Sequence, residues 1–416
     1  MKNIFTGLFV IIMFPTAVLS AVNVRDPRPP AGQGMTLADV IAEVKAGNPS
    51  LTAARRQLVV LEAGVKINSA YPNPGIEIEK AASGGSDGYE IKAVQPVPLT
   101  RRAGTAAAAA RADLEAAKKE TEALENFTLS SARKVWYALR IAKERRNFEE
   151  TNLKFSMDIL NNIEMRMQTG EAGNADLARA KVEASRSGYH LQEAEMARNA
   201  AAGALNSLMG RRPDTPLSVA ENGFSLAPVP PDLKPLEAYT GAALLNRVEP
   251  RALDLNVKAA DLSAALEKGK RLPVPELGFI RGSDGGTGYS RLFLGFELPL
   301  WYDNKGEIKK ALAHKDALVY GRSRLELAIR LEVYNTWLEL GLAQKRLAAS
   351  RETVFLLNDL RRTASQEYLS GKIDLAAFYE TNRIFLEENV NYLDALKEYY
   401  EKNAQMDAVT NNGEEK

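Results

Sequence analysis

The sequence predicts a mainly helical chain that carries β-strands of membrane-spanning length and consists of two tandem repeats. Long stretches rich in alanine, leucine and charged residues contain no proline, which favours helices. Two shorter stretches show the period-two alternation of strands. Residues that interrupt these elements recur at one fixed offset in the second half of the 416-residue chain.

Residues 1–20 have the pattern of a secretory signal peptide, with Lys2 ahead of an apolar run. A Pro/Gly-rich extended segment is expected at 21–35. No other stretch approaches about 20 consecutive apolar residues, so we expect no transmembrane helix in the mature chain. The protein is therefore predicted to be exported, and either to stay soluble or to enter a membrane as β-strands.

Each repeat is predicted to contain helices, a hairpin, a long helix, a turn and a last helix. Residues from about 102 to 168 predict one helix roughly 100 Å long at 1.5 Å per residue, which suits lateral packing against similar helices. The predicted divisions after the signal and extended segments are repeat 1 at 36–209 (hairpin about 74–98, turn about 170–174), a Pro-rich linker or equatorial region at 210–235, repeat 2 at 236–408 (hairpin about 275–299, turn about 370–374) and a disordered tail at 409–416.

The repeat is indicated by residues that keep one spacing between the two halves. Trp337 follows Trp136 by 201 residues, and Gly371 follows Gly170 by the same number. The prolines that bracket the two hairpins keep this offset as well. We interpret the halves as copies of one unit, and we expect both tryptophans to pack between helices.

Both hairpins have strands of roughly 9–11 residues, which is enough to cross a bilayer when tilted. Apolar residues recur at every other position, and the residues between them are often acidic. The predicted outward residues are Ile76, Ile78, Leu292, Leu294 and Phe296. The predicted residues of a wet interior are Glu77, Glu79, Glu276 and Glu297.

The two hairpins supply four strands, which cannot close a barrel alone. An open sheet in a bilayer leaves edge N–H and C=O groups unsatisfied, so several chains would have to share one barrel. Two chains would give about eight strands with a filled interior, and three would give about twelve with a lumen. The alternative is a soluble β-subdomain on a coiled-coil stalk.

The composition argues against catalysis, metal binding and nucleic-acid binding. The chain has no cysteine, and His190 and His314 lie far apart without metal-ligand spacing. A formal net charge of +1 gives no reason to expect a surface that binds nucleic acid or another polyanion. Without a nucleophile–base pair we expect no enzyme, no cofactor and no metal site.

Several motifs in a set order resemble those of the TolC-type outer-membrane efflux factors. The "PNP" and "PLxxxNKGEI" patterns are most similar to the CzcC/CusC-like heavy-metal RND branch. The motifs are Asn48-Pro49-Ser50-Leu51, Pro72-Asn73-Pro74, Gln95-Pro96-Val97-Pro98-Leu99 with Arg102 and Gly104, and Leu298-Pro299-Leu300 with Asn304, Gly306 and Ile308.

This resemblance implies a homotrimer with a twelve-stranded β-barrel in the outer membrane and a long periplasmic α-barrel. It implies a passive exit duct of a tripartite efflux pump, with a periplasmic adaptor (membrane fusion protein) and an inner-membrane RND transporter as partners. Heavy-metal resistance would be the function of the branch. The alternative function is a soluble periplasmic adaptor or stalk protein with coiled-coil hairpins.

The resemblance also points to site residues around the two helical turns. Relatives often carry two acidic residues after the second turn as constriction rings, and here Ala377 replaces the first while Glu380 keeps the second. An ion pair between Arg179 and Glu380 is one hypothesis for closure. The candidates for the duct constriction or gate are Asp176, Arg179, Asp374 and Glu380. The candidates for adaptor contact at the tips are Arg166, Gly170, Gly173, Gly371 and Lys372.

Overall fold

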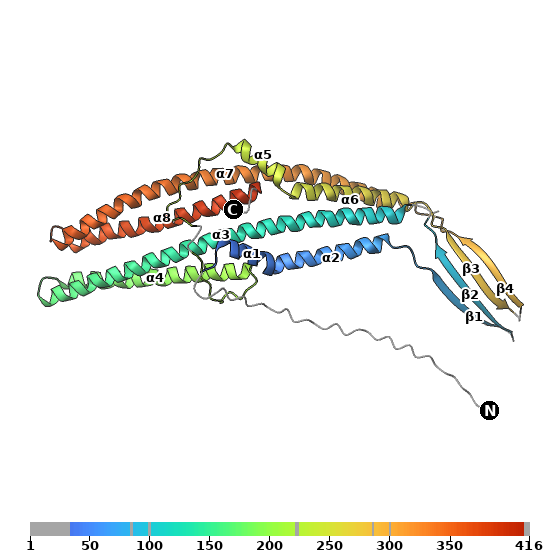
Figure 1. Cartoon of the computed structure of the whole chain (residues 1–416), viewed down its shortest axis with the longest axis horizontal. Helices are drawn as coiled ribbons and strands as arrows, with labels where there is room; N and C mark the ends of the chain where they lie inside the picture. The colour runs from blue at the N-terminus through green and yellow to red at the C-terminus, as the bar shows by residue number, and fades with distance from the viewer. Residues whose placement is uncertain are drawn as a thin grey trace, which may run out of the picture.

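The computed structural model describes residues 34–83, 86–98, 101–220, 224–284, 287–298 and 301–411. The predicted signal peptide, most of the segment at 21–35 and most of the tail at 409–416 lie outside the described residues. The molecule is elongated, with a four-stranded sheet at one end and two helical tips at the other (Figure 1). The predicted mainly helical fold with four strands per chain is confirmed.

One order of elements occurs twice along the chain: two helices, two strands and two helices. The first set is α1 (Leu37–Gly47), α2 (Pro49–Ser69), β1 (Gly75–Ser83), β2 (Ser86–Pro96), α3 (Arg102–Gln168) and α4 (Asn174–Leu208). The second set is α5 (Leu236–Asn246), α6 (Glu249–Gly269), β3 (Glu276–Asp284), β4 (Thr287–Gly295), α7 (Lys305–Leu369) and α8 (Leu375–Thr410).

The two longest helices connect the sheet to the tips. α3 has 67 residues and α7 has 65, each without proline and rich in residues that favour helix. α3 packs against α2, α4, α6 and α8, so it is the central helix of the chain. Such lateral packing stabilises helices that would be marginal alone.

Trp136 is the largest fully buried side chain, with an exposed fraction of 0%. Its indole Nε1 donates to the carbonyl oxygen of Met35 at 3.5 Å. In the second repeat, Trp337 donates to the carbonyl oxygen of Lys234 at 3.0 Å. Met35 precedes α1 and Lys234 precedes α5, so each tryptophan holds the chain that enters the short first helix of its own repeat.

The linker after α4 runs alongside the start of the first repeat. The N–H of Met35 donates to the Ser218 carbonyl at 2.8 Å, and the N–H of Ala220 donates to the Met35 carbonyl at 3.0 Å. These bonds form one parallel bridge, between Met35 and Val219. Nearby, the Asn48 side chain caps α2 and donates to the Leu208 carbonyl at 2.8 Å.

The last helix extends beyond its predicted end at 408. α8 continues to Thr410, whose side chain is almost fully buried and whose hydroxyl donates to the Met406 carbonyl at 2.8 Å. Burial and this hydrogen bond stabilise the last turn of α8, although residues 409 and 410 were predicted to belong to the polar tail. Among the described residues, none of the helices is both long and apolar enough to cross a membrane.

Candidate functional site

The strands form one antiparallel sheet in the order β1-β2-β3-β4. β2 and β3 belong to different repeats and pair directly, from Tyr89 opposite Ser283 to Pro96 opposite Glu276. β1 and β4 are the edges, and each pairs with a single neighbour. The outer N–H and C=O groups of these two edge strands therefore need a partner beyond the sheet.

One face of the sheet is apolar and exposed. Residues directly opposite each other in antiparallel strands share a face. The register places Ile78 opposite Ile91 and Phe279 opposite Leu292. The exposed fraction is 73% for Ile78 and 84% for Leu292. We call the following residues the apolar face: Ile76, Ile78, Ile91, Leu277, Phe279, Leu292 and Leu294.

The opposite face carries an ionic network. Lys92 Nζ lies 3.0 Å from Glu77 Oε2 in the first hairpin. Glu90 Oε2 accepts from the Tyr289 hydroxyl at 2.7 Å and from Arg291 Nη2 at 2.9 Å, which joins the two hairpins. We call the following residues the charged face: Glu77, Glu79, Glu90, Lys92, Glu276, Tyr289 and Arg291.

The alternation predicted from the sequence therefore corresponds to two real faces. The four predicted outward residues that lie within strands are all on the apolar face, and the three predicted inward glutamates within strands are all on the charged face. Phe296 and Glu297 follow the last residue of β4, Gly295. The first hairpin, whose sequence is the more polar, still contributes Ile76 and Ile78 to the apolar face.

A glycine on the charged face makes room for an aromatic ring. Gly278 lies directly opposite Phe293 across β3 and β4. A Cβ atom built at Gly278 would meet Phe293 Cε1 at 1.8 Å, so the ring lies against the bare backbone. Lys92 Nζ lies 5.4 Å from the centre of the same ring. Glycine at this position therefore lets Phe293 cover the sheet and contact a cation.

At the other end of the molecule, both tips are closed by the same turn. Gly170 and Gly371 have φ values of +78° and +73°, a conformation that favours glycine. After α3, the N–H of Gly170 donates to the Met167 carbonyl at 3.1 Å and the N–H of Glu171 donates to the Arg166 carbonyl at 2.8 Å. This pair of bonds is the Schellman motif, and the same pair occurs at Gly371 after α7.

Two of the candidate acidic residues cap the helices that follow these turns. Asp374 is the N-cap of α8 and accepts from the N–H of Ala377 at 2.8 Å. Asp176 lies in the first turn of α4 and accepts from the N–H of Gly173 at 3.5 Å. Both carboxylates are thus used locally, where a helix N-terminus favours negative charge.

The two tips also contact each other. Arg166, near the end of α3, donates to the hydroxyl of Tyr368 on α7 at 3.5 Å and lies 3.7 Å from the Glu171 carboxylate. Lys372 is exposed, and its N–H donates to the Glu367 carbonyl at 2.8 Å. The tips therefore present an exposed basic residue next to a fixed pair of turns.

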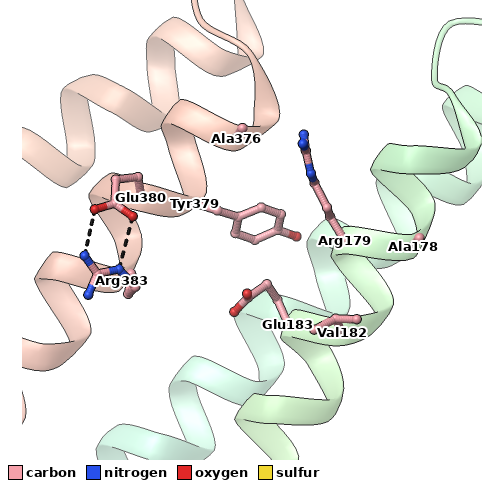
Figure 2. Close-up of a pocket in the computed structure, with 8 residues that line it drawn as sticks. All are labelled: Ala178, Arg179, Val182, Glu183, Ala376, Tyr379, Glu380 and Arg383. Atoms are coloured by element: carbon pink, nitrogen blue, oxygen red, sulfur yellow. Dashed lines mark hydrogen bonds and ion pairs between the residues drawn. The ribbon is translucent and has the colours of Figure 1, made fainter.

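A cavity of about 420 Å³ lies between α4 and α8, close to the tips. Its lining comes from both repeats (Figure 2). The lining residues are Ala178, Arg179, Val182, Glu183, Ala376, Tyr379, Glu380 and Arg383. The cavity therefore brings the gate candidates Arg179 and Glu380 to one place, while Asp176 and Asp374 cap their helices outside its lining.

The hypothetical ion pair between Arg179 and Glu380 is not formed in this conformation. Glu380 instead accepts two hydrogen bonds from Arg383, at 2.7 and 3.1 Å, one turn further along α8 (Figure 2). These bonds lower the pKa of Glu380. Burial, together with the negative charge of Glu183, raises the pKa of Tyr379. At neutral pH the cavity thus holds a neutral phenol beside ionised Glu380.

The hydroxyl of Tyr379 is buried and has no hydrogen-bond partner among the described residues. Its ring packs beside Phe378, which is only 1% exposed and belongs to the apolar core beneath the tips.

Across the described ranges, no group of three His, Asp or Glu side chains is placed to hold a metal ion.

Several solved structures are similar to this chain over most of its length. The Campylobacter jejuni CmeC outer membrane channel matches with a TM-score of 0.78 and 15% identity, over 91% of this chain and 86% of that one. This chain has the fold of an outer-membrane channel. The open state of the Neisseria gonorrhoeae MtrE outer membrane channel matches with a TM-score of 0.74 and 18% identity, over 90% of this chain and 88% of that one.

CusC, whose branch the motifs resemble, is also among the similar structures. CusC matches with a TM-score of 0.75 and 14% identity, over 90% of this chain and 91% of that one. The TolC-type architecture predicted from the motifs is thereby confirmed at the level of the fold. No protein-family model matches the sequence, and no curated protein matches it closely.

Within this channel fold, the sequence did not predict three polar residues of the tip cavity: Glu183, Tyr379 and Arg383. The spacing of Glu380 and Arg383, three apart on one helix, is a signal that could have predicted their ion pair. Nothing local could have predicted that Glu183 faces Tyr379, because α4 and α8 come from different repeats.

Proposed function

We propose that this chain is the outer-membrane exit duct of a tripartite efflux pump and that it works as a homotrimer. The observation that carries the proposal is the sheet, which has one exposed apolar face, one charged face and two unpaired edges. An exposed apolar face of this kind suits lipid, and the channel fold of the similar structures supports the same conclusion.

The edges of the sheet require other copies of the chain. In hydrocarbon, each unsatisfied backbone group costs several kcal/mol, so β1 and β4 cannot remain open. Pairing β4 of one copy with β1 of the next removes every edge once the ring closes. Three copies of the four-stranded sheet give about twelve strands, which leaves a lumen for the charged face.

The outer helices support the same assembly. α7 exposes apolar side chains at heptad-like spacing, and α4 does so at intervals of seven residues. α7 and α4 lie on opposite sides of the helical part (Figure 1). Copies side by side would bring the tip halves of α4 and α7 into contact and form a periplasmic helical barrel. The exposed apolar residues of these two halves are Leu342, Phe355, Leu356 and Leu360 on α7 and Val182, Tyr189 and Met196 on α4.

In this proposal the duct is passive and does no chemistry. Its tips, with Arg166, Gly170, Gly173, Gly371 and Lys372, contact a periplasmic adaptor that links it to an inner-membrane RND transporter. The resemblance of the motifs to the CusC-like branch favours metal ions as the exported substrate. The competing reading, a soluble adaptor or stalk, leaves the exposed apolar face of the sheet without a role.

For the gate, we propose that Arg179 and Glu380 act around the tip cavity, while Asp176 and Asp374 hold the helix starts. The gate is tested by single-channel conductance of Glu380→Ala, which frees Arg383 and is expected to change the closed-state conductance. Glu387→Ala is the matched control, since Glu387 also binds Arg383, at 3.1 Å, but does not line the cavity. Equal conductance in both variants would argue against a gate here.

The duct itself is tested by cell fractionation, gel mobility and planar bilayers. We expect detergent-dependent extraction from the outer membrane, a heat-sensitive trimer and step-like conductance. A monomer in the soluble periplasmic fraction would contradict the proposal.

Leu292→Glu places a charge on the apolar face and costs up to about 2 kcal/mol in lipid. Ile280→Glu makes the same change on the other face, beside Lys92 and Arg291, and should be tolerated.

A further inference from the structure

The root of the sheet, where strands meet helices, exposes large apolar and aromatic side chains. Trp301, just after β4, is 98% exposed, whereas Trp136 is 0% exposed. Tyr302 beside it is 58% exposed. Tyr71 and Leu272 precede β1 and β3 at equivalent positions of the two repeats, and they are 62% and 55% exposed. Water is a poor environment for such a set of side chains.

These residues lie at one level of the molecule. The N–H of Val97 donates to the Pro275 carbonyl at 2.8 Å, which joins the roots of β2 and β3. Arg271, after α6, lies 3.3 Å from Asp303, before α7. In a ring of copies, this level would form a continuous belt at the membrane-proximal end of the helices.

Basic side chains accompany the belt. Lys268 and Lys309 are exposed, on the last turn of α6 and the first turns of α7. Within the described part of the chain, neither lysine has an acidic side chain at ion-pair distance, whereas Asp303 lies 2.8 Å from Lys305. Two exposed ammonium groups that form no ion pair with a described residue therefore lie at the helix ends next to the root of the sheet, and Lys268 also interacts with Asp261 at longer range.

We propose that this belt binds the headgroups of anionic phospholipids in the periplasmic leaflet, with Trp301 in the interfacial layer and Lys268 and Lys309 on the lipid phosphates. Tryptophan and tyrosine favour the membrane–water interface, because their rings are amphipathic. Lysines near an anionic surface gain electrostatic energy. The apolar face continues toward this level through Phe296 and Leu298, which are 55% and 57% exposed. The inference rests on the proposed membrane location of the sheet.

Trp301 provides a direct probe, because the chain has only three tryptophans. Trp136 and Trp337 lie about 50 Å along their helices at 1.5 Å per residue, far from any lipid at the root of the sheet. The full chain is reconstituted in liposomes of phosphatidylcholine or phosphatidylglycerol that are brominated near the glycerol backbone. Bromine is expected to quench part of the emission in the wild type and none of it in Trp301→Phe.

The charge requirement is tested by comparing quenching by the two brominated lipids. The wild type should respond to a lower mole fraction of phosphatidylglycerol than of phosphatidylcholine. Each lysine replaced by glutamine, at 268 or 309, should reduce that preference about fivefold, since one basic residue near an anionic surface contributes about 1 kcal/mol. Lys154→Gln with Lys345→Gln is the matched control on exposed helical surface and should leave the preference unchanged.

The outcomes separate this inference from the duct itself. Liposomes that conduct ions but show no quenching of Trp301 would overturn the lipid belt and leave the duct intact. Quenching that is equal for both lipids and insensitive to the lysines would overturn the choice of anionic headgroups. A chain that neither inserts nor conducts would overturn the duct, and the inference with it.

Discussion

Arg102 is expected to hold the junction between the two repeats, and its loss should destabilise the protein measurably. Its Nε and Nη2 atoms donate to the Gly269 carbonyl at 2.9 and 2.7 Å, and Nη2 also contacts the Leu272 carbonyl. Gly269 is the last residue of α6, so the guanidinium lies at the negative end of that helix.

The magnitude follows from these contacts. A hydrogen bond from a charged donor contributes about 1.5–3 kcal/mol, and a cation at a helix C-terminus adds about 0.3–1 kcal/mol. Because the two well-formed bonds share one acceptor, we count them as a single hydrogen bond. The expected loss of unfolding free energy for Arg102→Leu is then about 2–4 kcal/mol. Arg102→Lys keeps the positive charge but loses the planar set of guanidinium donors, and should lose about half of this unfolding free energy.

The assay is urea unfolding of the detergent-solubilised protein followed by circular dichroism, with amide exchange measured at the end of α6. Arg101→Leu is the control, since Arg101 is exposed and its side chain makes no cap hydrogen bond. We expect a change of less than about 0.5 kcal/mol there. Equal stability of Arg101→Leu and Arg102→Leu would refute the role assigned to the guanidinium, as would unchanged exchange at Gly269.

Three further outcomes are expected. Trp136→Ala should cost about 3–5 kcal/mol in unfolding free energy, and the half-buried Trp337→Ala less, as measured by denaturant midpoints. Burial raises the pKa of Glu149, so the ionised carboxylate destabilises the folded state when the pH is above that pKa. Glu149→Gln should therefore raise the melting temperature at neutral pH, and this gain should shrink as the pH falls and the wild-type carboxyl becomes protonated. Gly371→Ala should cost about 1–2 kcal/mol locally through backbone strain alone, visible as faster exchange at that tip, because no heavy atom lies within 4 Å of the new Cβ.

Most of the fold could be predicted because its signals are local. The end of α3 at Gln168 and the turn at Gly170 follow from helix propensity and from glycine at the left-handed position. The alternation around Leu292 follows from the period of a strand. Such signals depend on a few neighbouring residues and persist in any tertiary arrangement.

The candidate site was predicted less completely, because its residues depend on distant partners. The hypothesis for closure paired Glu380 with Arg179, but in this structure Glu380 is bound to Arg383, one turn further along α8. Asp374 and Asp176, which stay predicted duct residues, each also accept a backbone hydrogen bond at the start of their own helix. Competition between local and distant partners is decided by distances that sequence spacing does not contain.

The sequence by itself determined the two repeats, the long helices, the two hairpins and the polarity of each strand face. Only the tertiary structure decided that β2 pairs with β3 across the repeats, with Tyr89 opposite Ser283, so that two short amphipathic hairpins become one sheet with continuous faces. It also decided which helices enclose the tip cavity. The reason is physical: periodicity is set by backbone geometry over a few residues, whereas pairing between elements about 200 residues apart depends on how the whole chain packs.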